Sequence, residues 1–133
     1  MHEWALAEAV ISTAMKTVKE KNINEVTEFR IKMGELQQIE LEIFEFAMKQ
    51  MMKKYQVLKN AKIDIEMVEA LLRCNSCGHE WGFAKDELTH EESESIHFIP
   101  EMAHTYLRCP ECGSPDFEVI RGRGVELESL EVK

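Results

Sequence analysis

Two copies of a Cys-x-x-Cys-Gly segment constrain this 133-residue chain more than any other feature of its sequence. Two intervening residues let both thiolates of one segment face the same ion, and the glycine permits the tight turn that directs backbone amides toward sulfur. No cysteine lies outside the two segments, so the sequence predicts one site with four sulfur ligands. These ligands are Cys74, Cys77, Cys109 and Cys112.

Zn²⁺ suits a set of four thiolates, which bind it as a tetrahedron at Zn–S distances of about 2.3 Å. Such a set leaves no position for water, so the sequence predicts a structural site rather than a catalytic one. A rubredoxin-like electron carrier uses similar segments to bind iron and is an open alternative. Disulfide bonds are a weaker interpretation, because reduced cytosolic cysteines at this spacing are usually metal ligands.

The charge of the chain bears on its partners and its location. The 25 acidic and 16 basic residues give a net charge of −9, and the basic residues are scattered. An anionic surface repels phosphate backbones, which disfavours the second alternative, a zinc-ribbon protein that binds nucleic acid. No stretch approaches the roughly 20 apolar residues that span a bilayer, and the acidic N-terminus lacks the basic start of a signal peptide. We therefore expect a cytoplasmic protein that binds neither nucleic acid nor membrane.

Hydrophobic periodicity predicts helices and strands on both sides of the cysteines. Residues 4–20 and 39–54 carry apolar side chains at three- and four-residue steps, which indicates two helices. Residues 25–33, 61–67 and 119–132 alternate apolar and polar side chains, which is typical of strands. The apolar faces expected for the two helices are Trp4, Ala7, Ile11, Ala14, Met15 and Val18, and Ile39, Ile43, Phe46, Ala47 and Met51.

Residues 71–118 have poor helical periodicity and hold all four cysteines with four of the five histidines. A small segment of this kind has a thin core, for which a bound metal compensates. The sequence therefore predicts an α+β fold. Residues 1–70 and 119–133 would form one domain with a small mixed sheet and two helices, and residues 71–118 an inserted zinc-ribbon-like module. We expect no enzymatic activity, because no phosphate loop, HExxH motif or activated nucleophile is evident.

The first three residues, Met1, His2 and Glu3, are a second candidate metal site. A histidine at position 2 offers three nitrogens in sequence: the α-amine of Met1, the deprotonated amide of His2 and its imidazole. Nitrogen ligands in a plane favour Ni²⁺ or Cu²⁺ over Mg²⁺ or Ca²⁺, and the amide or carboxylate of Glu3 is a fourth donor. Taken alone, the pattern favours the simpler explanation that His2 precedes a helix whose dipole Glu3 stabilises.

Four features of the chain carry a resemblance to a known family. They are Met1-His2-Glu3, Gly34-Glu35-Leu36, both cysteine segments and Arg121-Gly122-Arg123-Gly124-Val125. On these residues, the chain resembles the HypA family of nickel metallochaperones for hydrogenase maturation. The resemblance covers nearly the full length, and the combination of the N-terminal motif with the two cysteine pairs makes it specific.

The resemblance implies a role for each candidate site. His2 looks like the essential nickel ligand, assisted by backbone nitrogens and by Glu3, and the four cysteines look like a zinc site that shapes the protein. The resemblance also implies transfer of Ni²⁺ to the large subunit of a [NiFe] hydrogenase, together with a HypB-type GTPase. Some bacterial relatives also serve urease.

The segment between the cysteine pairs is longer than in typical bacterial members of the family. It resembles the archaeal branch through the stretch Ile96-His97-Phe98-Ile99-Pro100-Glu101. By similarity to that branch, we expect His97 to complete a square nickel plane with the N-terminal ligands. His90 and His104 are expected to be surface or packing residues.

Overall fold

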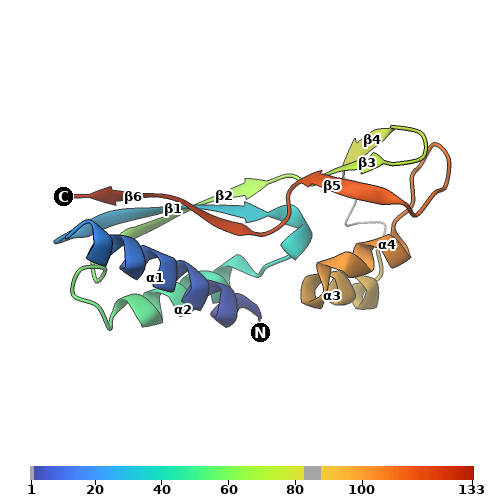
Figure 1. Cartoon of the computed structure of the whole chain (residues 1–133). Coiled ribbons are helices and arrows are strands. Elements are labelled where there is room, and N and C mark those ends of the chain that lie inside the picture. The colour runs from blue at the N-terminus through green and yellow to red at the C-terminus, as the bar shows by residue number, and fades with distance from the viewer. Residues whose placement is uncertain (1, 83–87) are drawn as a thin grey trace. The chain divides into compact units, whose positions relative to one another are not determined.

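The computed structural model describes residues 2–82 and 88–133 (Figure 1). The chain divides into two compact units, and each of them is built from segments that are distant in the sequence. The first unit comprises Met1–Lys32, Ile39–Glu66 and Val125–Lys133, and the second comprises Met33–Gln38 and Met67–Gly124.

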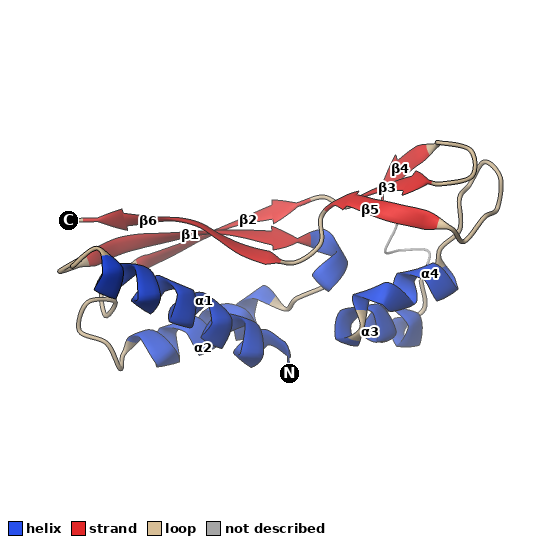
Figure 2. Cartoon of the chain, viewed as in Figure 1, coloured by secondary structure: helices blue, strands red, loops and turns tan. Residues whose placement is uncertain are grey.

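A three-stranded sheet with two helices on one face forms most of the first unit (Figure 2). Strands β1 and β2 point in the same direction and are joined through α2, whereas β6 runs the opposite way, so the sheet is mixed, as predicted. The strand order is β2-β1-β6. The elements are α1 (His2–Glu20), β1 (Val26–Gly34), α2 (Leu41–Met52), β2 (Lys62–Val68) and β6 (Val125–Val132).

The apolar face predicted for α1 is largely confirmed. Ala7, Ile11, Ala14 and Val18 are buried at helical spacing. Met15 is only partly buried, and Trp4 is exposed, with 42% of its side chain accessible.

The face predicted for α2 is wrong in part. Phe44 and Met48 are fully buried, whereas Ile43 and Phe46 are 39% and 56% exposed. Apolar residues occur around most of this helix, so their spacing alone does not select the face that meets the core. The ring of Phe46 instead packs edge to face against Trp4, with 6.1 Å between ring centroids.

The second unit contains an antiparallel sheet of three short strands in the order β4-β3-β5. Leu72 in the central strand lies opposite Trp81 on one side and Val119 on the other. The elements are η1 (Glu35–Gln37), β3 (Leu71–Cys74), β4 (Glu80–Gly82), α3 (His90–Phe98), η3 (Pro100–Met102), α4 (Ala103–Tyr106) and β5 (Phe117–Arg121).

The sequence showed only poor helical periodicity between the cysteine pairs, and the structure places α3 and α4 there. Helix α3 has weak hydrophobic periodicity, but it begins with a capping box. The hydroxyl of Thr89 accepts from the amide of Glu92 at 3.1 Å, and the carboxylate of Glu92 accepts from the amide of Thr89 at 2.9 Å. The local signal for this helix is therefore its cap.

The strand predicted over residues 119–132 is in fact two strands. Gly122 and Gly124, with φ of +92° and +87°, separate β5 from β6. Side chains other than glycine rarely adopt this backbone region, so the Gly-Arg-Gly sequence ends one strand and starts another. Strand β5 consequently joins the sheet of the second unit, and β6 joins that of the first.

The second unit has a hydrophobic core of its own. It is formed by residues of η1, β3, α3, α4 and β5 and by residues directly beside β3 and α4, with Trp81 and Tyr106 packed against them. The core residues are Leu36, Ala70, Leu72, Ile96, Ala103, Leu107 and Phe117.

In the part of the chain that the structure describes, no helix is both long and apolar enough to cross a bilayer.

Candidate functional site

The two cysteine segments fold into matching turns. The amide of Gly78 donates to the carbonyl of Cys74 at 3.0 Å, and the amide of Gly113 donates to the carbonyl of Cys109 at 2.8 Å. Both glycines have positive φ, +80° and +75°. The glycine that follows each pair therefore closes the tight turn, as its position in the sequence predicts.

Hydrogen bonds join the first turn to the second. The backbone amide of Asn75 donates to the carbonyl of Asp116 at 2.9 Å, and its side-chain amide donates to the carboxylate of Asp116 at 3.0 Å. The hydroxyls of Ser76 and Ser114 lie 3.3 Å apart. These contacts hold the second turn beside the first.

The sulfur atoms of Cys74, Cys77, Cys109 and Cys112 all lie within 4.8 Å of one another. The distances are 3.5 Å from Cys74 to Cys112 and 3.6 Å from Cys77 to Cys109, and all four thiols are free. A tetrahedron with Zn–S distances of about 2.3 Å has edges of about 3.8 Å. The structure thus brings the predicted ligands together in a cluster whose size and chemistry fit one Zn²⁺.

Backbone amides lower the pKa of one thiol in this cluster. The amide of Cys77 has the largest effect, and it outweighs burial to lower the pKa of Cys74 to about 6. The amide of Ser76, 3.4 Å from the same sulfur, acts in the same direction. Cys74 therefore gives up its proton more readily than an ordinary thiol.

Two other thiols of the cluster hold their protons more firmly. The amide of His79 lowers the pKa of Cys77, but burial and the neighbouring cysteine thiols outweigh it and raise the pKa to about 12. At Cys112, the amide of Ser114 is likewise outweighed, here by the Cys74 thiol and by burial, so its pKa is raised. One thiolate already present disfavours the formation of others beside it.

Zinc binding to the metal-free chain is expected to release protons at neutral pH. Cys77 and Cys112 must lose theirs to become ligands, so the apparent association constant should rise at least about 100-fold per pH unit, tenfold for each of these two protons. Competition titrations at pH 6.5 and 7.5, in buffers of different ionisation enthalpy, measure both the constant and the protons released. An association constant that does not change with pH would contradict this expectation.

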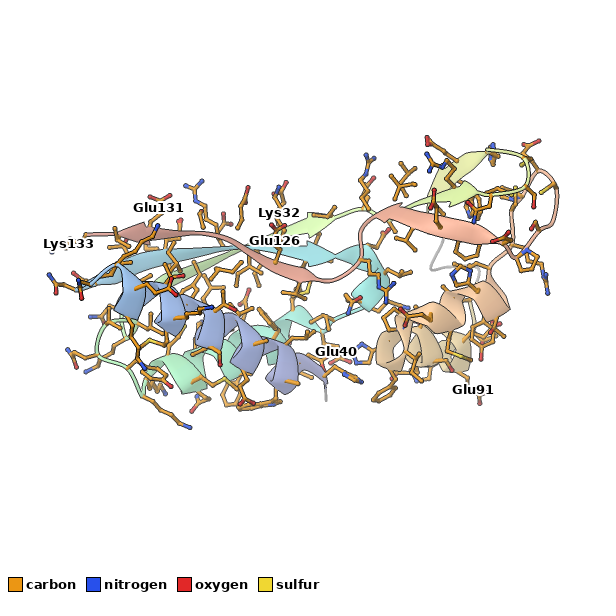
Figure 3. The ribbon with its side chains drawn as sticks, viewed as in Figure 1. Lys32, Glu40, Glu91, Glu126, Glu131 and Lys133 are labelled. Atoms are coloured by element: carbon orange, nitrogen blue, oxygen red, sulfur yellow. The ribbon has the colours of Figure 1, made fainter. Side chains whose placement is uncertain are left out.

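The N-terminal candidate site lies at the beginning of α1, which starts at His2, while Met1 is outside the described residues. Glu3 is 2% exposed, and its carboxylate accepts a hydrogen bond of 3.1 Å from the amide of Glu40. Glu40, labelled in Figure 3, is the residue just before α2. The Glu3 carboxylate therefore stabilises the N-terminal end of α2 as well as lying in the first turn of α1.

The histidines between the cysteine pairs differ in their surroundings. His97, in the last turn of α3, is 8% exposed, and its Nδ1 lies 3.0 Å from the carbonyl oxygen of Gln37. His90 is exposed at the start of the same helix. His104 stacks on Phe117 with 4.1 Å between ring centroids. The expectation of surface or packing roles is confirmed for His90 and His104.

Two contacts of the candidate nickel ligands had no signal in the sequence. The bond between Glu3 and Glu40 spans 37 residues, and the contact between His97 and Gln37 spans 60. Local patterns do not report pairs at such separations, so only the folded chain reveals them.

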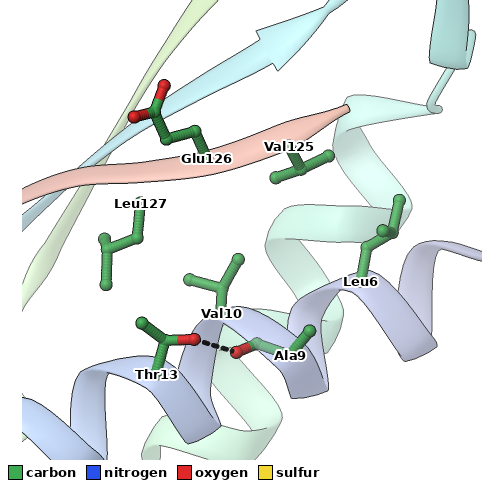
Figure 4. A pocket seen from close by; sticks show the side chains of 7 residues that line it. All are labelled: Leu6, Ala9, Val10, Thr13, Val125, Glu126 and Leu127. Atoms are coloured by element: carbon green, nitrogen blue, oxygen red, sulfur yellow. Dashed lines mark hydrogen bonds between the residues drawn. The ribbon is translucent and has the colours of Figure 1, made fainter. Parts of the chain in front are cut away.

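A pocket between α1 and the edge strand β6 has no cysteine or histidine among the described residues of its lining and so is not a further candidate for metal binding (Figure 4). Its volume is about 310 Å³, and most of its lining is apolar. The hydroxyl of Thr13 donates to the carbonyl of Ala9 within the helix, and Glu126 points away from the helix. The lining residues are Leu6, Ala9, Val10, Thr13, Val125, Glu126 and Leu127.

Comparison with known proteins decides the family. The sequence model described as "Hydrogenase/urease nickel incorporation, metallochaperone, hypA" matches residues 1–132. The chain belongs to the HypA family. The hydrogenase maturation factor HypA of Pyrococcus abyssi is 42% identical over an alignment of 135 positions that covers 100% of this chain and 96% of that protein. The HypA of Thermococcus sibiricus is also 42% identical, with 100% and 97% covered. The expected resemblance to archaeal members of HypA is thereby confirmed.

Solved structures of HypA proteins share the fold at lower sequence identity. The solution structure of the Ni metallochaperone HypA from Helicobacter pylori has a TM-score of 0.65 at 21% identity, covering 98% of this chain and 96% of that one. A second HypA solution structure has a TM-score of 0.63 at 22% identity, covering 100% and 97%. At these identities the likeness shows the α+β fold alone.

Proposed function

We propose that this chain binds Ni²⁺ at its N-terminus and delivers it, with a HypB-type GTPase, to the large subunit of a [NiFe] hydrogenase. The proposed ligands of the nickel plane are the amine of Met1 and the amide and imidazole of His2, with His97 completing the plane and the amide of Glu3 as a further donor. The observation that carries the proposal is the match to a family of nickel metallochaperones, which includes the N-terminal residues. The name of that family also supports urease as a second client.

The position of His2 as the first residue of α1 supports this ligand set. The first four amides of an α-helix have no acceptor within the helix, so deprotonating those of His2 and Glu3 breaks no helical hydrogen bond. A cation here is repelled by the helix dipole, which is equivalent to about half a positive charge. Negative charge on deprotonated amides offsets that repulsion. The Glu3 carboxylate already accepts a hydrogen bond from the backbone amide of Glu40. This contact supports the backbone amide of Glu3, rather than its carboxylate, as the donor to nickel.

For the cysteine cluster we propose a bound structural Zn²⁺. Four sulfurs would occupy every position of a tetrahedral ion, so the ion would supply no catalytic chemistry. A role as a metallochaperone likewise requires no enzymatic activity of the chain. Family membership favours this protein class over the nucleic-acid-binding and rubredoxin-like alternatives that the cysteine spacing also allowed. Metal analysis of purified protein separates them, because we expect zinc and no iron.

Replacing His2 with alanine is expected to abolish stoichiometric nickel binding while zinc stays bound. The substitution removes the imidazole of the proposed chelate but leaves all four thiols in place. Calorimetric titration of the untagged, zinc-loaded chain with Ni²⁺ measures the loss, and metal analysis of the same sample measures retained zinc.

His90→Ala is the matched control, because it removes an exposed imidazole from a different part of the chain. This variant should bind nickel like the unmodified protein. An uncleaved N-terminal tag, which blocks the amine of Met1, should resemble His2→Ala. Unchanged nickel affinity in His2→Ala or in the tagged protein would refute the assignment of the site.

A further inference from the structure

One face of α3 is bound to two consecutive glutamines. Ser93 and His97 are four residues apart in this helix, so they lie one turn apart on the same face. The hydroxyl of Ser93 donates to the side-chain carbonyl of Gln38, and the side-chain amide of Gln38 donates to the carbonyl of Ser93 at 3.1 Å. One turn later, Nδ1 of His97 meets the carbonyl of Gln37.

The backbone of these glutamines is fixed from several directions. Gln38 has φ of +49°, a left-handed conformation that L side chains rarely adopt, and its amide donates to the carbonyl of Glu35 at 3.1 Å. The side-chain oxygen of Gln37 accepts from the amide of Gly124 at 3.2 Å. An unfavourable backbone conformation persists where its surroundings determine it. The Gln37 carbonyl is therefore held in place on one side by Gly124 and on the other by the contacts of Gln38.

The Gln37 carbonyl determines which nitrogen of His97 carries the proton. A carbonyl oxygen only accepts hydrogen bonds, so Nδ1 of the neutral imidazole must donate and the lone pair must lie on Nε2. Metal-binding histidines usually donate their other ring nitrogen in this way, which orients the ring and raises its basicity. The 8% exposure of His97 further restricts the ring.

We propose that Gln38 and Ser93 are positioning residues that hold His97 in the Nδ1–H tautomer, with Nε2 as its metal-binding nitrogen. Their paired hydrogen bonds fix the rotation of α3 about its axis and its position relative to Gln37. The carbonyl of Gln37 then determines the tautomer of His97. The inference rests on the proposed function, in which His97 is a nickel ligand. Gln38 and Ser93 would thereby contribute to the nickel affinity without contacting the metal.

The tautomer is measured directly by ¹⁵N NMR of the intact, zinc-loaded and nickel-free chain, labelled at histidine, at about pH 8, above the ordinary titration range of the imidazole. His97 should be predominantly the Nδ1–H form in the unmodified protein. Gln38→Ala and Ser93→Ala should shift it toward the mixture of a solvent-exposed imidazole. His97 found as the Nε2–H form, or unaffected by both substitutions, would overturn the inference.

Matched variants separate the side-chain contacts from effects of the backbone. Gln38→Asn keeps an amide and tolerates the left-handed conformation, but it is one methylene too short to keep both bonds to Ser93. It should behave like Gln38→Ala. Ser93→Thr retains the hydroxyl and should keep the tautomer. His104, whose Nδ1 lies 3.2 Å from the carbonyl of Pro115, is an internal control that should not change in any variant.

Nickel affinity supplies the second readout. Loss of a group that orients a metal ligand typically weakens binding about 10- to 100-fold, and Gln38→Ala should fall in this range without exceeding the loss in His97→Ala. In the double variant Gln38→Ala/His97→Ala, the loss should equal that of His97→Ala alone, because both act through one ligand. Losses that add would contradict action through His97.

The two readouts also separate a failure of the inference from a failure of the proposed function. Unchanged nickel affinity in His97→Ala would remove His97 from the proposed ligand set and overturn its metal-binding role. In that case the NMR result would still decide whether Gln38 and Ser93 set its tautomer. Loss of nickel in His97→Ala, with the tautomer unaffected by Gln38→Ala and Ser93→Ala, would retain the ligand and refute the positioning residues.

Discussion

Removal of metal from the cysteine cluster is expected to unfold the second unit of the intact chain while the first stays folded. Structural zinc contributes apparent binding free energies of about 10–16 kcal/mol in small zinc domains at pH 7. Most single domains have a free energy of unfolding of about 5–15 kcal/mol. Loss of the zinc contribution is therefore large enough to unfold a domain of this size. Strand β3 ends at a cysteine, Cys74, and β5 pairs with it, so loss of the ion removes the support of this sheet at one end.

Circular dichroism melts with and without a strong chelator measure this effect. The zinc-loaded chain should melt at high temperature, and the chelated chain should lose signal at a much lower temperature, with recovery when zinc is added. Hydrogen exchange locates the change. The amides of Val10 and Phe29, in the core of the first unit, should stay protected, while that of Leu72 in β3 should not.

A pair of substitutions in one turn provides the control for chelation. Cys77→Ser removes one sulfur of the cluster and should reproduce the effect of the chelator. Ser76→Ala, its neighbour, removes only an exposed hydroxyl contact of 3.3 Å and should change the stability by less than about 1 kcal/mol. Equal protection of Leu72 with and without metal would show that the second unit folds independently of the ion.

The cysteine cluster could be predicted from sequence because its information is local. Each pair lies within one turn, and the glycine after it specifies the positive φ that the turn requires. Helix α1 was also predictable, because polar residues separate its apolar positions. In α2, apolar residues such as Phe44 and Phe46 lie close together around the helix, and only contact with the rest of the first unit selects Phe44 for the core.

The environment of the candidate nickel ligands could not be predicted in the same way. The Glu3 carboxylate meets the N-terminal end of a helix that begins 38 residues later in the chain, at Leu41. Gln38 reaches Ser93 across 55 residues. Neither pair belongs to a repeating pattern, and both depend on how the tertiary structure brings distant segments together. The sequence therefore indicated the candidate ligands, and only the fold shows which distant residues lie beside them.

Gly122→Ala is expected to destabilise the protein by more than about 4 kcal/mol, an exceptional value for one methyl group. A Cβ at this position would lie 2.3 Å from the Cα of Ala70, and its φ of +92° is unfavourable for alanine. The backbone of Ala70 cannot easily move away, because its amide donates to the carboxylate of Glu35 at 3.0 Å. Urea unfolding of the zinc-loaded chain, followed by circular dichroism, measures the loss.

Other glycines of the chain separate the two causes of this effect. Gly124 has φ of +87° but open space around its Cβ position, so Gly124→Ala should lose only about 1 kcal/mol from the backbone conformation. Gly34 has φ of −71°, but its Cβ would lie 2.3 Å from the carbonyl oxygen of Gly122, so Gly34→Ala isolates the steric clash. At Gly82 the nearest atom is 3.9 Å away, and Gly82→Ala should be nearly neutral. If Gly122→Ala lost no more stability than Gly124→Ala, the close approach of the Gly122 and Ala70 backbones would not be a constraint on this fold.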